Sequence, residues 1–308
     1  MIQSIFTTVA LMLVYMIFGF VLCKVGKAKV SHAKSLSALL IYVFSPAMLV
    51  NSFLNLEYSQ ENLINIGKCF GITLFVQLLF FMILYCILHK KYKDAKYRIL
   101  TVGAVLGNVG FMGMPVIESV FPGNPIVLCY SSINVMTMNL IVFTLGVFMI
   151  TNNRKFISIK NAFLNPTSLS IFFALPVFLF RWNLPEVVTG AIGALAKAVT
   201  PMCMIILGMR LSEAKIKEVF TRPFVYFTCI LKLVVFPLFA FILVRWMPFA
   251  DDVLKTTVIV LAMTPSGAVI ESMAELHECE QGLAANVVLL TTILSVATIP
   301  IMTFLLIR

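Results

Sequence analysis

The sequence predicts an all-α polytopic membrane protein, with ten transmembrane helices in two inverted five-helix repeats and with helices four and nine broken and crossing. Three observations support this fold. Hydrophobic residues make up 61% of the chain and charged residues 12%, whereas soluble domains contain about 25% charged residues. The apolar residues gather in runs long enough to cross a bilayer, and motifs of the first half return in the second half.

Ten apolar runs reach the length of about 20 residues that a membrane-crossing helix needs. Their connections are short, and the longest, 151–165, lies midway through the chain. We therefore expect a first five-helix repeat over 1–150, a central cytoplasmic link over 151–165 and a second, inverted repeat over 166–308. The expected spans lie near 4–23, 35–55, 63–88, 97–120, 125–150, 166–182, 187–209, 223–246, 253–275 and 281–307.

Basic residues are distributed unevenly between the two sides of the predicted bilayer. Connections after odd-numbered spans hold sixteen of the 23 Lys and Arg residues, the opposite side holds five, and Lys197 and Lys232 lie inside spans. Because cytoplasmic connections are enriched in Lys and Arg, we expect a multi-pass protein of the cytoplasmic membrane with both termini outside. The net charge of +10 then reflects topology, and no nucleic-acid partner is expected.

Cysteine and histidine usage argues against metal or catalytic chemistry. The seven cysteines are scattered singly without CxxC spacing, and the three histidines fall in or beside polar connections. The spans show no nucleophile–His–acid arrangement and no phosphate-binding loop. We therefore expect no enzyme activity, no metal and no cofactor. No basic segment precedes the first apolar run, so we expect a retained span rather than a signal peptide.

Weak internal similarity supports the two repeats. Interruptions in corresponding spans of inverted repeats indicate a binding site at the repeat interface. Four pairs occur in the same order in both halves: Ser45-Pro46 with Thr200-Pro201, Gln77 with Lys232, Pro115 with Pro265, and Asn134-Val135 with Asn286-Val287.

The segment GNVGFMGMP, from Gly107 to Pro115, interrupts the fourth span. Each glycine costs about 1 kcal/mol in a helix interior, and the proline lacks an amide hydrogen. One interpretation is a proline-kinked helix packed through small residues. The other, favoured by the matching Pro265, is a broken helix at a transport site, because unwound backbone at membrane depth must line a cavity or lie inside protein.

Half-helices that begin at Pro115 and Pro265 would direct partial positive charge from their N-termini into such a site. Free amides of residues 113–116 and 266–268 could then hold a carboxylate, with the Asn108 amide and the Ser266 hydroxyl as further donors. The alternative role for Asn108 is a packing hydrogen bond between helices.

Polar residues inside the spans leave the energy source open. Lys232 could balance an anionic substrate or form a structural pair. Gln77 and Glu271 are candidates for ion coupling. For Glu271 the reason is that a buried carboxylate can carry a proton in such proteins. Na⁺ would instead need neutral oxygens, which several side chains could supply. These are Asn108, Asn134, Asn139, Asn286, Thr291 and Thr292.

These motifs resemble those of a known family. The segment Gly107–Pro115 resembles the fourth-span signature of the auxin efflux carrier family, in its bacterial branch. TPSGA at 264–268 followed by SMAE at 272–275 looks like the ninth-span motif, and TTILS at 291–295 with Pro300 looks like the last span. The resemblance covers the whole chain.

The resemblance implies a secondary transporter that exports a small organic anion, a mono- or dicarboxylate, by elevator-type alternating access within the lipid bilayer. Spans 1, 2, 6 and 7 would form a scaffold that makes a homodimer, and spans 3–5 and 8–10 a mobile transport domain. Alternatives are a sodium-coupled organic-anion symporter of the bile-acid type and a transport-inactive membrane sensor. The candidate substrate-binding residues are Asn108, Gly110, Gly113, Pro115, Pro265, Ser266, Gly267, Ala268, Pro46, Pro201, Asn134, Asn286 and Lys232.

Overall fold

The structure, a computed structural model, describes residues 2–213 and 222–307. In this part of the chain the named elements are all helical, and eight helices are long and apolar enough to cross a membrane. The predicted fourth and ninth spans are interrupted. The chain is therefore an all-α polytopic membrane protein, as predicted. Lys215, Lys217 and Arg308, which contribute to the predicted orientation, lie outside the described residues.

The first half of the chain contains the residues of the first five predicted spans. Side chains at the expected positions cap two of its helices: Ser59 accepts a hydrogen bond from the Asn62 amide, and Asp94 accepts one from the Lys96 amide. In order, the elements are α1 (Ile2–Lys24), α2 (His32–Leu39), the π-helical turn η1 (Leu40–Phe44), α3 (Ser45–Leu54), α4 (Gln60–Leu88), η2 (His89–Lys91), α5 (Ala95–Val105), the π-helical turn η3 (Val109–Gly113), α6 (Met114–Val120), α7 (Ile126–Ile141), the π-helical turn η4 (Val142–Gly146) and α8 (Val147–Thr151).

The second half supplies the remaining spans. Its elements are η5 (Arg154–Phe156), α9 (Ile159–Leu164), α10 (Pro166–Leu179), α11 (Glu186–Glu213), α13 (Pro223–Ile230), the π-helical turn η6 (Leu231–Val235), α14 (Phe236–Arg245), α15 (Asp252–Ala262), α16 (Val269–Leu276) and α17 (Gln281–Leu306).

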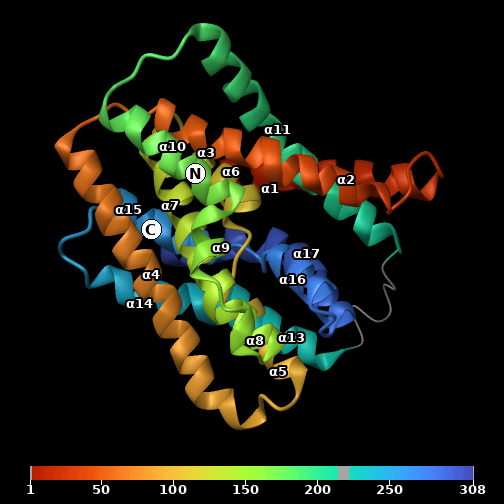
Figure 1. The fold of residues 1–308 in the computed structure, drawn as a ribbon. Coiled ribbons are helices and arrows are strands. Elements are labelled where there is room, and N and C mark those ends of the chain that lie inside the picture. Colours follow the sequence, from red (N-terminus) through yellow and green to blue (C-terminus); the bar gives the residue numbers. More distant parts are fainter. Residues whose placement is uncertain (1, 214–221, 308) are drawn as a thin grey trace.

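Helices α1, α2, α3, α10 and α11 pack together, and we call them the α1–α11 group. In Figure 1, α1 and α2 run beside α11 along one side of the molecule. Two glycines permit this close approach. A Cβ at Gly208 of α11 would collide with the Met16 carbonyl of α1, and one at Gly19 of α1 would collide with the Ile205 carbonyl of α11. Small residues at such crossings are typical of helix packing in membranes.

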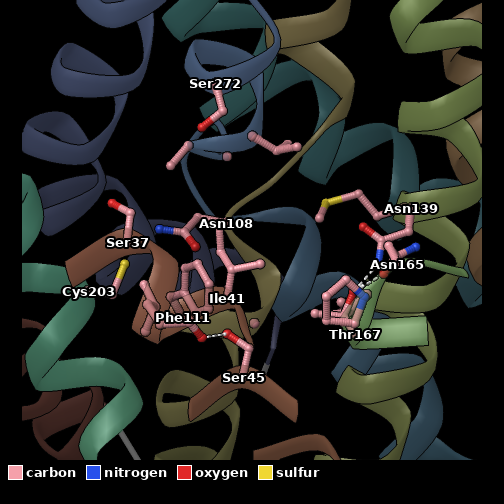
Figure 2. Close-up of a pocket in the computed structure, with 18 of the residues that line it drawn as sticks. Ser37, Ile41, Ser45, Asn108, Phe111, Asn139, Asn165, Thr167, Cys203 and Ser272 are labelled. Atoms are coloured by element: carbon pink, nitrogen blue, oxygen red, sulfur yellow. Dashed lines mark hydrogen bonds between the residues drawn. The ribbon is translucent and has the colours of Figure 1, made fainter. Parts of the chain in front are cut away.

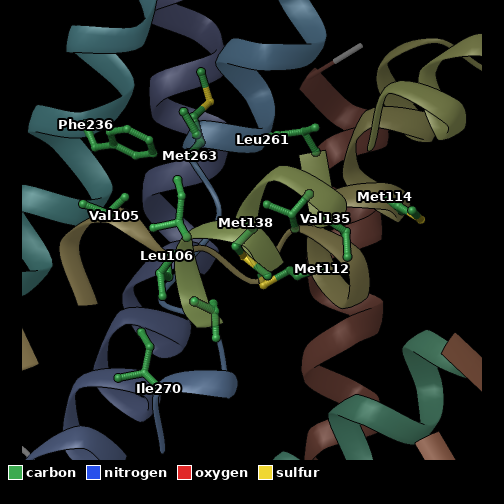
Figure 3. Packing of buried hydrophobic residues seen from close by; sticks show 14 of the residues in the cluster. Val105, Leu106, Met112, Met114, Val135, Met138, Phe236, Leu261, Met263 and Ile270 are labelled. Atoms are coloured by element: carbon green, nitrogen blue, oxygen red, sulfur yellow. The ribbon is translucent and has the colours of Figure 1, made fainter. Parts of the chain in front are cut away.

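The helices α4–α8 and α13–α17 form a second body, which we call the crossover group (Figure 1). Here α4 packs on α7, α14 on α15, and α17 on both α13 and α16. Its centre is a dry cluster around the two interrupted spans, which Figure 3 shows from close by. Leu106, Met112, Val135, Leu261 and Met263 contribute to this cluster, and each is less than one-tenth exposed. Large apolar residues on the outside suit a lipid environment.

The predicted central link over 151–165 is partly helical. Ser158 caps α9 by accepting from the Asn161 amide, and Asn165 caps α10 by accepting from the Ser168 amide. Pro166 stands in the first turn of α10, where its missing amide hydrogen costs nothing. This link is therefore a structured connection, and it brings Asn161 and Asn165 to the wall of a large cavity.

Candidate functional site

The two interrupted spans cross each other through their unwound backbones. The Asn108 amide donates to the Pro265 carbonyl over 2.7 Å, and the Gly267 amide donates to the Leu106 carbonyl over 3.0 Å. Gly107 and Ser266 thereby form an antiparallel bridge. The broken, crossing helices predicted from the paired prolines are present. Backbone groups that hydrocarbon could not satisfy are satisfied by the other broken span.

Close packing explains the glycines of the crossing. A Cβ at Gly267 would lie 3.0 Å from the backbone carbonyl oxygen of Gly107. A Cβ at Gly107 would lie 2.5 Å from the side-chain Oγ1 of Thr264 and 3.0 Å from Lys232 Nζ.

Contrary to the prediction from the sequence, neither half-helix begins at its proline. The half-helix of the fourth span begins before Pro115, because η3 and α6 form one continuous helix from Val109 to Val120. The half-helix of the ninth span begins after Pro265, because α16 starts only at Val269. The intervening residues are held in the unwound pairing instead.

The amides expected to be free for a carboxylate have partners within the protein. The Gly113 amide donates to the Asn108 carbonyl, and the Gly267 amide to the Leu106 carbonyl. The Ser266 amide donates to Thr291 Oγ1 over 3.2 Å. The Ser266 hydroxyl, fully buried, donates to the Gly103 carbonyl over 2.8 Å. In this conformation Ser266 therefore stabilises the crossing. The amides of Gly113, Ser266 and Gly267 are not free to bind a carboxylate, contrary to the prediction from the sequence.

A cavity of about 720 Å³ lies against the crossing, between the α1–α11 group and the crossover group. Figure 2 shows Asn108 among its lining residues, together with side chains from α2, α7 and α11. Of the predicted site residues, it is lined by Asn108, Gly110, Gly267, Ala268 and Glu271. A pocket of this size with a few polar groups is typical of small-molecule sites.

Two kinds of wall enclose this cavity. Polar groups cluster on one side, where Asn139 Nδ2 donates to Thr167 Oγ1 over 2.6 Å and to Asn165 Oδ1 over 3.3 Å (Figure 2). The Ser45 hydroxyl is spent on the Leu40 carbonyl over 2.7 Å. Apolar side chains form much of the remainder: Met48, Phe111, Val135, Met138, Phe143, Ile206, Leu207 and Val288.

An ion pair at the cavity joins the two helix groups. Nη1 of Arg210, on α11, lies 2.7 Å from Oε1 of Glu271, on α16. Glu271 is a predicted coupling candidate, but Arg210 was expected only as a charge in a cytoplasmic connection. The one sequence signal for it is that α16 carries acidic residues, Glu271 and Glu275, toward an end where the other connections are basic.

Lys232 lies on the other side of the crossing, completely buried. Its Nζ lies 3.5 Å from the carbonyl oxygen of Val105 and 3.4 Å from that of Ala262. These are the last residues of α5 and α15, so the ammonium group faces the negative ends of both broken helices. The Phe236 ring centroid lies 4.5 Å away. The Lys232 amino group therefore contacts the ends of both helices and lies outside the large cavity.

Lys232 shares a small void with two other predicted residues. Gln77 Nε2 donates to Asn134 Oδ1 over 2.9 Å, and both side chains line a void of about 20 Å³ together with Lys232. Gln77 and Lys232, matched by the sequence repeat, thus lie at one place. No carboxylate is among the described residues that line this void.

A second cavity, of about 350 Å³, lies between the two groups and contains Pro115 and Pro201. Met48 lines both this cavity and the large one. Between them, Thr200 Oγ1 of α11 donates to the Phe111 carbonyl of η3 over 3.3 Å. The two cavities are therefore separated by contacts of the α1–α11 group with the fourth span.

Three further predicted residues lie outside the large cavity. Gly113 packs against α15, where a Cβ would lie 2.8 Å from Leu261 Cδ2. Pro46 is in the first turn of α3, between the lining residues Ser45 and Met48. Asn286 is buried within α17. Among the described residues, no group of three His, Cys, Asp or Glu side chains could hold a metal.

Comparison with known proteins places the chain among transporters. The family described as "Membrane transport protein" matches residues 4–303. An uncharacterized transporter of Methanocaldococcus jannaschii is 26% identical over 299 residues, which cover 94% of this chain and 95% of that protein. The family match extends over both interrupted spans and every element that lines the cavity. The chain therefore belongs to this membrane transport protein family, the auxin efflux carrier family that its fourth-span motif resembles.

Proposed function

We propose that the protein is a secondary transporter that exports a small organic anion, a carboxylate, across the cytoplasmic membrane. The observation that carries this proposal is the cavity at the crossing. Its wall combines the side-chain amide of Asn108, the cationic side chain of Arg210 and apolar side chains. An amide and a guanidinium are donors suited to a carboxylate, and apolar walls suit an organic body.

An elevator-type movement is supported by the way the two groups meet. The crossover group would move as one body past the α1–α11 group, as transport domain and scaffold respectively. The two cavities lie on either side of a contact made by Thr200 and Phe111. Sliding of the crossover group would break this contact and let Asn108 pass from one cavity toward the other.

The direction follows from the proposed orientation. With the basic connections in the cytoplasm, the end of α11 that carries Arg210 is cytoplasmic, and the large cavity is the one open to the inside. The inside-negative potential then supplies about 2.3 kcal/mol per charge per 100 mV for outward movement of an anion. An exporter would need no coupling ion.

The position of Lys232 supports a mechanism without sodium. In carriers with broken helices, the C-terminal ends of half-helices commonly bind a coupling cation. Here the Lys232 ammonium occupies that position, within 3.5 Å of both end carbonyls. We propose that this fixed cation does the work that Na⁺ would do in the sodium-coupled alternative.

Counterflow in proteoliposomes tests the proposal. Wild type, Asn108→Ala and Asn286→Ala are loaded with one acid and offered labelled malate or a panel of mono- and dicarboxylates. Flux should be lost in Asn108→Ala and kept in Asn286→Ala, since only Asn108 lines the cavity. Normal flux in a folded Asn108→Ala variant would refute the site. Binding without flux in wild type would favour the sensor alternative.

The scaffold is also proposed to make the homodimer. The α1–α11 group presents exposed apolar side chains, among them Phe18, Leu39 and Phe173. Part of this surface would contact lipid and part a second copy. The mass of the purified protein by light scattering, corrected for detergent, distinguishes a monomer from a dimer.

A further inference from the structure

The ion pair between Arg210 and Glu271 joins two bodies that transport requires to separate. The 2.7 Å contact runs from α11 of the α1–α11 group to α16 of the crossover group. The Arg210 side chain is 20% exposed and that of Glu271 9%, so the pair lies at the wall of the cavity and within reach of water. Glu275 is more distant, with its Oε1 4.0 Å from Arg210 Nη1, and its side chain is 54% exposed.

Arg210 is the basic residue among the described residues that line the cavity, and Glu271 is the acidic one. The backbone amides at Gly113, Ser266 and Gly267 are already spent within the protein. Lys232 is fully buried on the other side of the crossing. Among the described residues that line the cavity, Arg210 therefore supplies the positive charge that an anion can reach. In this conformation the Glu271 carboxylate is paired with it.

We propose that Arg210 binds the carboxylate of the transported anion, and that the Glu271 carboxylate occupies Arg210 when no anion is bound. This inference rests on the proposed function and specifies how the same site recognises its substrate. A guanidinium presents paired donors that match a carboxylate, so the substrate carboxylate can replace the Glu271 carboxylate on the same atoms. The displaced Glu271 turns toward the wet end of the cavity, where the neighbouring Ser272 is exposed.

The exchange also selects the class of anion. One guanidinium accepts one carboxylate, and the rest of the ligand meets the apolar side chains of Met48, Phe111, Val135 and Met138. A second carboxylate would be desolvated there without a cationic partner among the described lining residues. The site therefore favours a monocarboxylate with an apolar body over a dicarboxylate of equal length.

The exchange links binding to movement. While Glu271 occupies Arg210, the ion pair fastens α16 to α11 and opposes sliding of the crossover group. A substrate carboxylate on Arg210 releases α16. The empty carrier is thereby held in place. Because Arg210 stays with the α1–α11 group, the anion must leave Arg210 when the crossover group moves.

The test compares the KM for counterflow of hexanoate and adipate in wild type, Glu271→Gln, Arg210→Gln and the double variant. Glu271→Gln removes the competing carboxylate, so the KM for hexanoate should fall severalfold. Arg210→Gln should raise it at least as much. The double variant contains neither charge, so it should fold and bind weakly even if a single variant does not fold. Adipate should have the higher KM wherever Arg210 is present.

Glu275→Gln is the matched control, since it removes a carboxylate of the same helix that is exposed and more distant from Arg210. It should leave the KM near the wild-type value. The inference is overturned if Glu271→Gln leaves the KM unchanged, if Arg210→Gln transports hexanoate as well as wild type does, or if adipate is preferred.

A binding measurement distinguishes a failure of transport from a failure of the Arg210 site. Thermal melting in detergent reports stabilisation by hexanoate whether or not flux occurs. If wild type moves no acid but hexanoate stabilises Glu271→Gln more than wild type, transport fails and the Arg210 site stands. If wild type transports acids but Glu271→Gln gains no stabilisation, the function stands and this inference fails.

Discussion

The two sides of the crossing solve the same electrostatic problem in opposite ways. On the cavity side, the Arg210 cation is held by a Glu271 carboxylate at a partly exposed ion pair. On the other side, the Lys232 cation is completely buried and is held by two backbone carbonyls. Gly107, in the unwound segment of the fourth span, lines both the cavity that contains the ion pair and the void beside Lys232.

The difference in burial determines which charge can be exchanged. Removing a buried cation leaves the ends of two helices uncompensated in a dry environment, so Lys232 is a permanent part of the fold. A carboxylate in contact with water can leave its partner at lower cost, because water solvates both charges. The crossing therefore has one fixed and one exchangeable cation.

The largest expected effect comes from Lys232→Met. It removes the charge from two helix ends, each worth up to about 2 kcal/mol in a buried setting. We expect a clearly lower melting temperature in detergent and loss of counterflow, with partial retention in Lys232→Arg. Lys197→Met is the control, since Lys197 is exposed at the smaller cavity. Equal melting temperatures for the two Met variants would show that the Lys232 site is not a structural one.

A smaller effect is expected from Gly267→Ala. The new Cβ would lie 3.0 Å from the Gly107 oxygen and 3.3 Å from its carbon, so the two backbones must move apart. Such crowding typically costs about 1–3 kcal/mol, and the displaced crossing should slow counterflow. At Gly282, nothing lies within 4 Å of the added carbon, so Gly282→Ala should melt no lower than wild type. If both variants behave alike, the crossing is not tightly packed.

Ser266→Ala should have a more modest effect. It removes the buried hydrogen bond from the Ser266 hydroxyl to the Gly103 carbonyl, at a cost of about 1 kcal/mol. Thermal melting should show a small decrease. Ser272→Ala alters an exposed serine of the cavity and should leave the melting temperature unchanged. The reverse order would mean that Ser266 contributes to the ligand site rather than to the crossing.

No effect at all is expected from replacing Na⁺ by choline on both sides of the proteoliposome membrane. Because Lys232 supplies a cation at the ends of α5 and α15, the initial rate of counterflow should not change. A rate that rises with Na⁺ would support the sodium-coupled alternative and would require a cation site elsewhere.

The sequence predicts the fold well because its strongest signals are local. Proline and glycine interrupt the fourth and ninth spans through local effects that do not depend on the position of the other span. Both breaks are therefore predicted correctly. The partners of the freed backbone are not local. Ser266 and Gly267 bond to the fourth span, more than 150 residues earlier, and this pairing delays the start of α16 to Val269.

The same limit applies to the site. Lys232 and Glu271 stand out in the sequence as charges inside apolar spans, yet their partners are a pair of helix ends and an arginine of another span. In the sequence, Arg210 resembles any other basic residue at the end of a predicted span. Only the fold brings it to Glu271 at the cavity, so the residue proposed to bind the substrate is one that the sequence alone does not single out.

A native cysteine allows a direct test of whether the substrate binds in the large cavity. Cys203 lines the large cavity (Figure 2), whereas Cys69 and Cys229 are buried away from it. Purified protein is treated with a small methanethiosulfonate, with and without the transported acid, and each cysteine peptide is quantified by mass spectrometry. Exposed Cys86 serves as the reference.

We predict that Cys203 is modified, that the transported acid slows its modification, and that Cys86 reacts equally in both samples. Modification of Cys203 at the same rate with and without a saturating acid would show that the substrate binds outside this cavity.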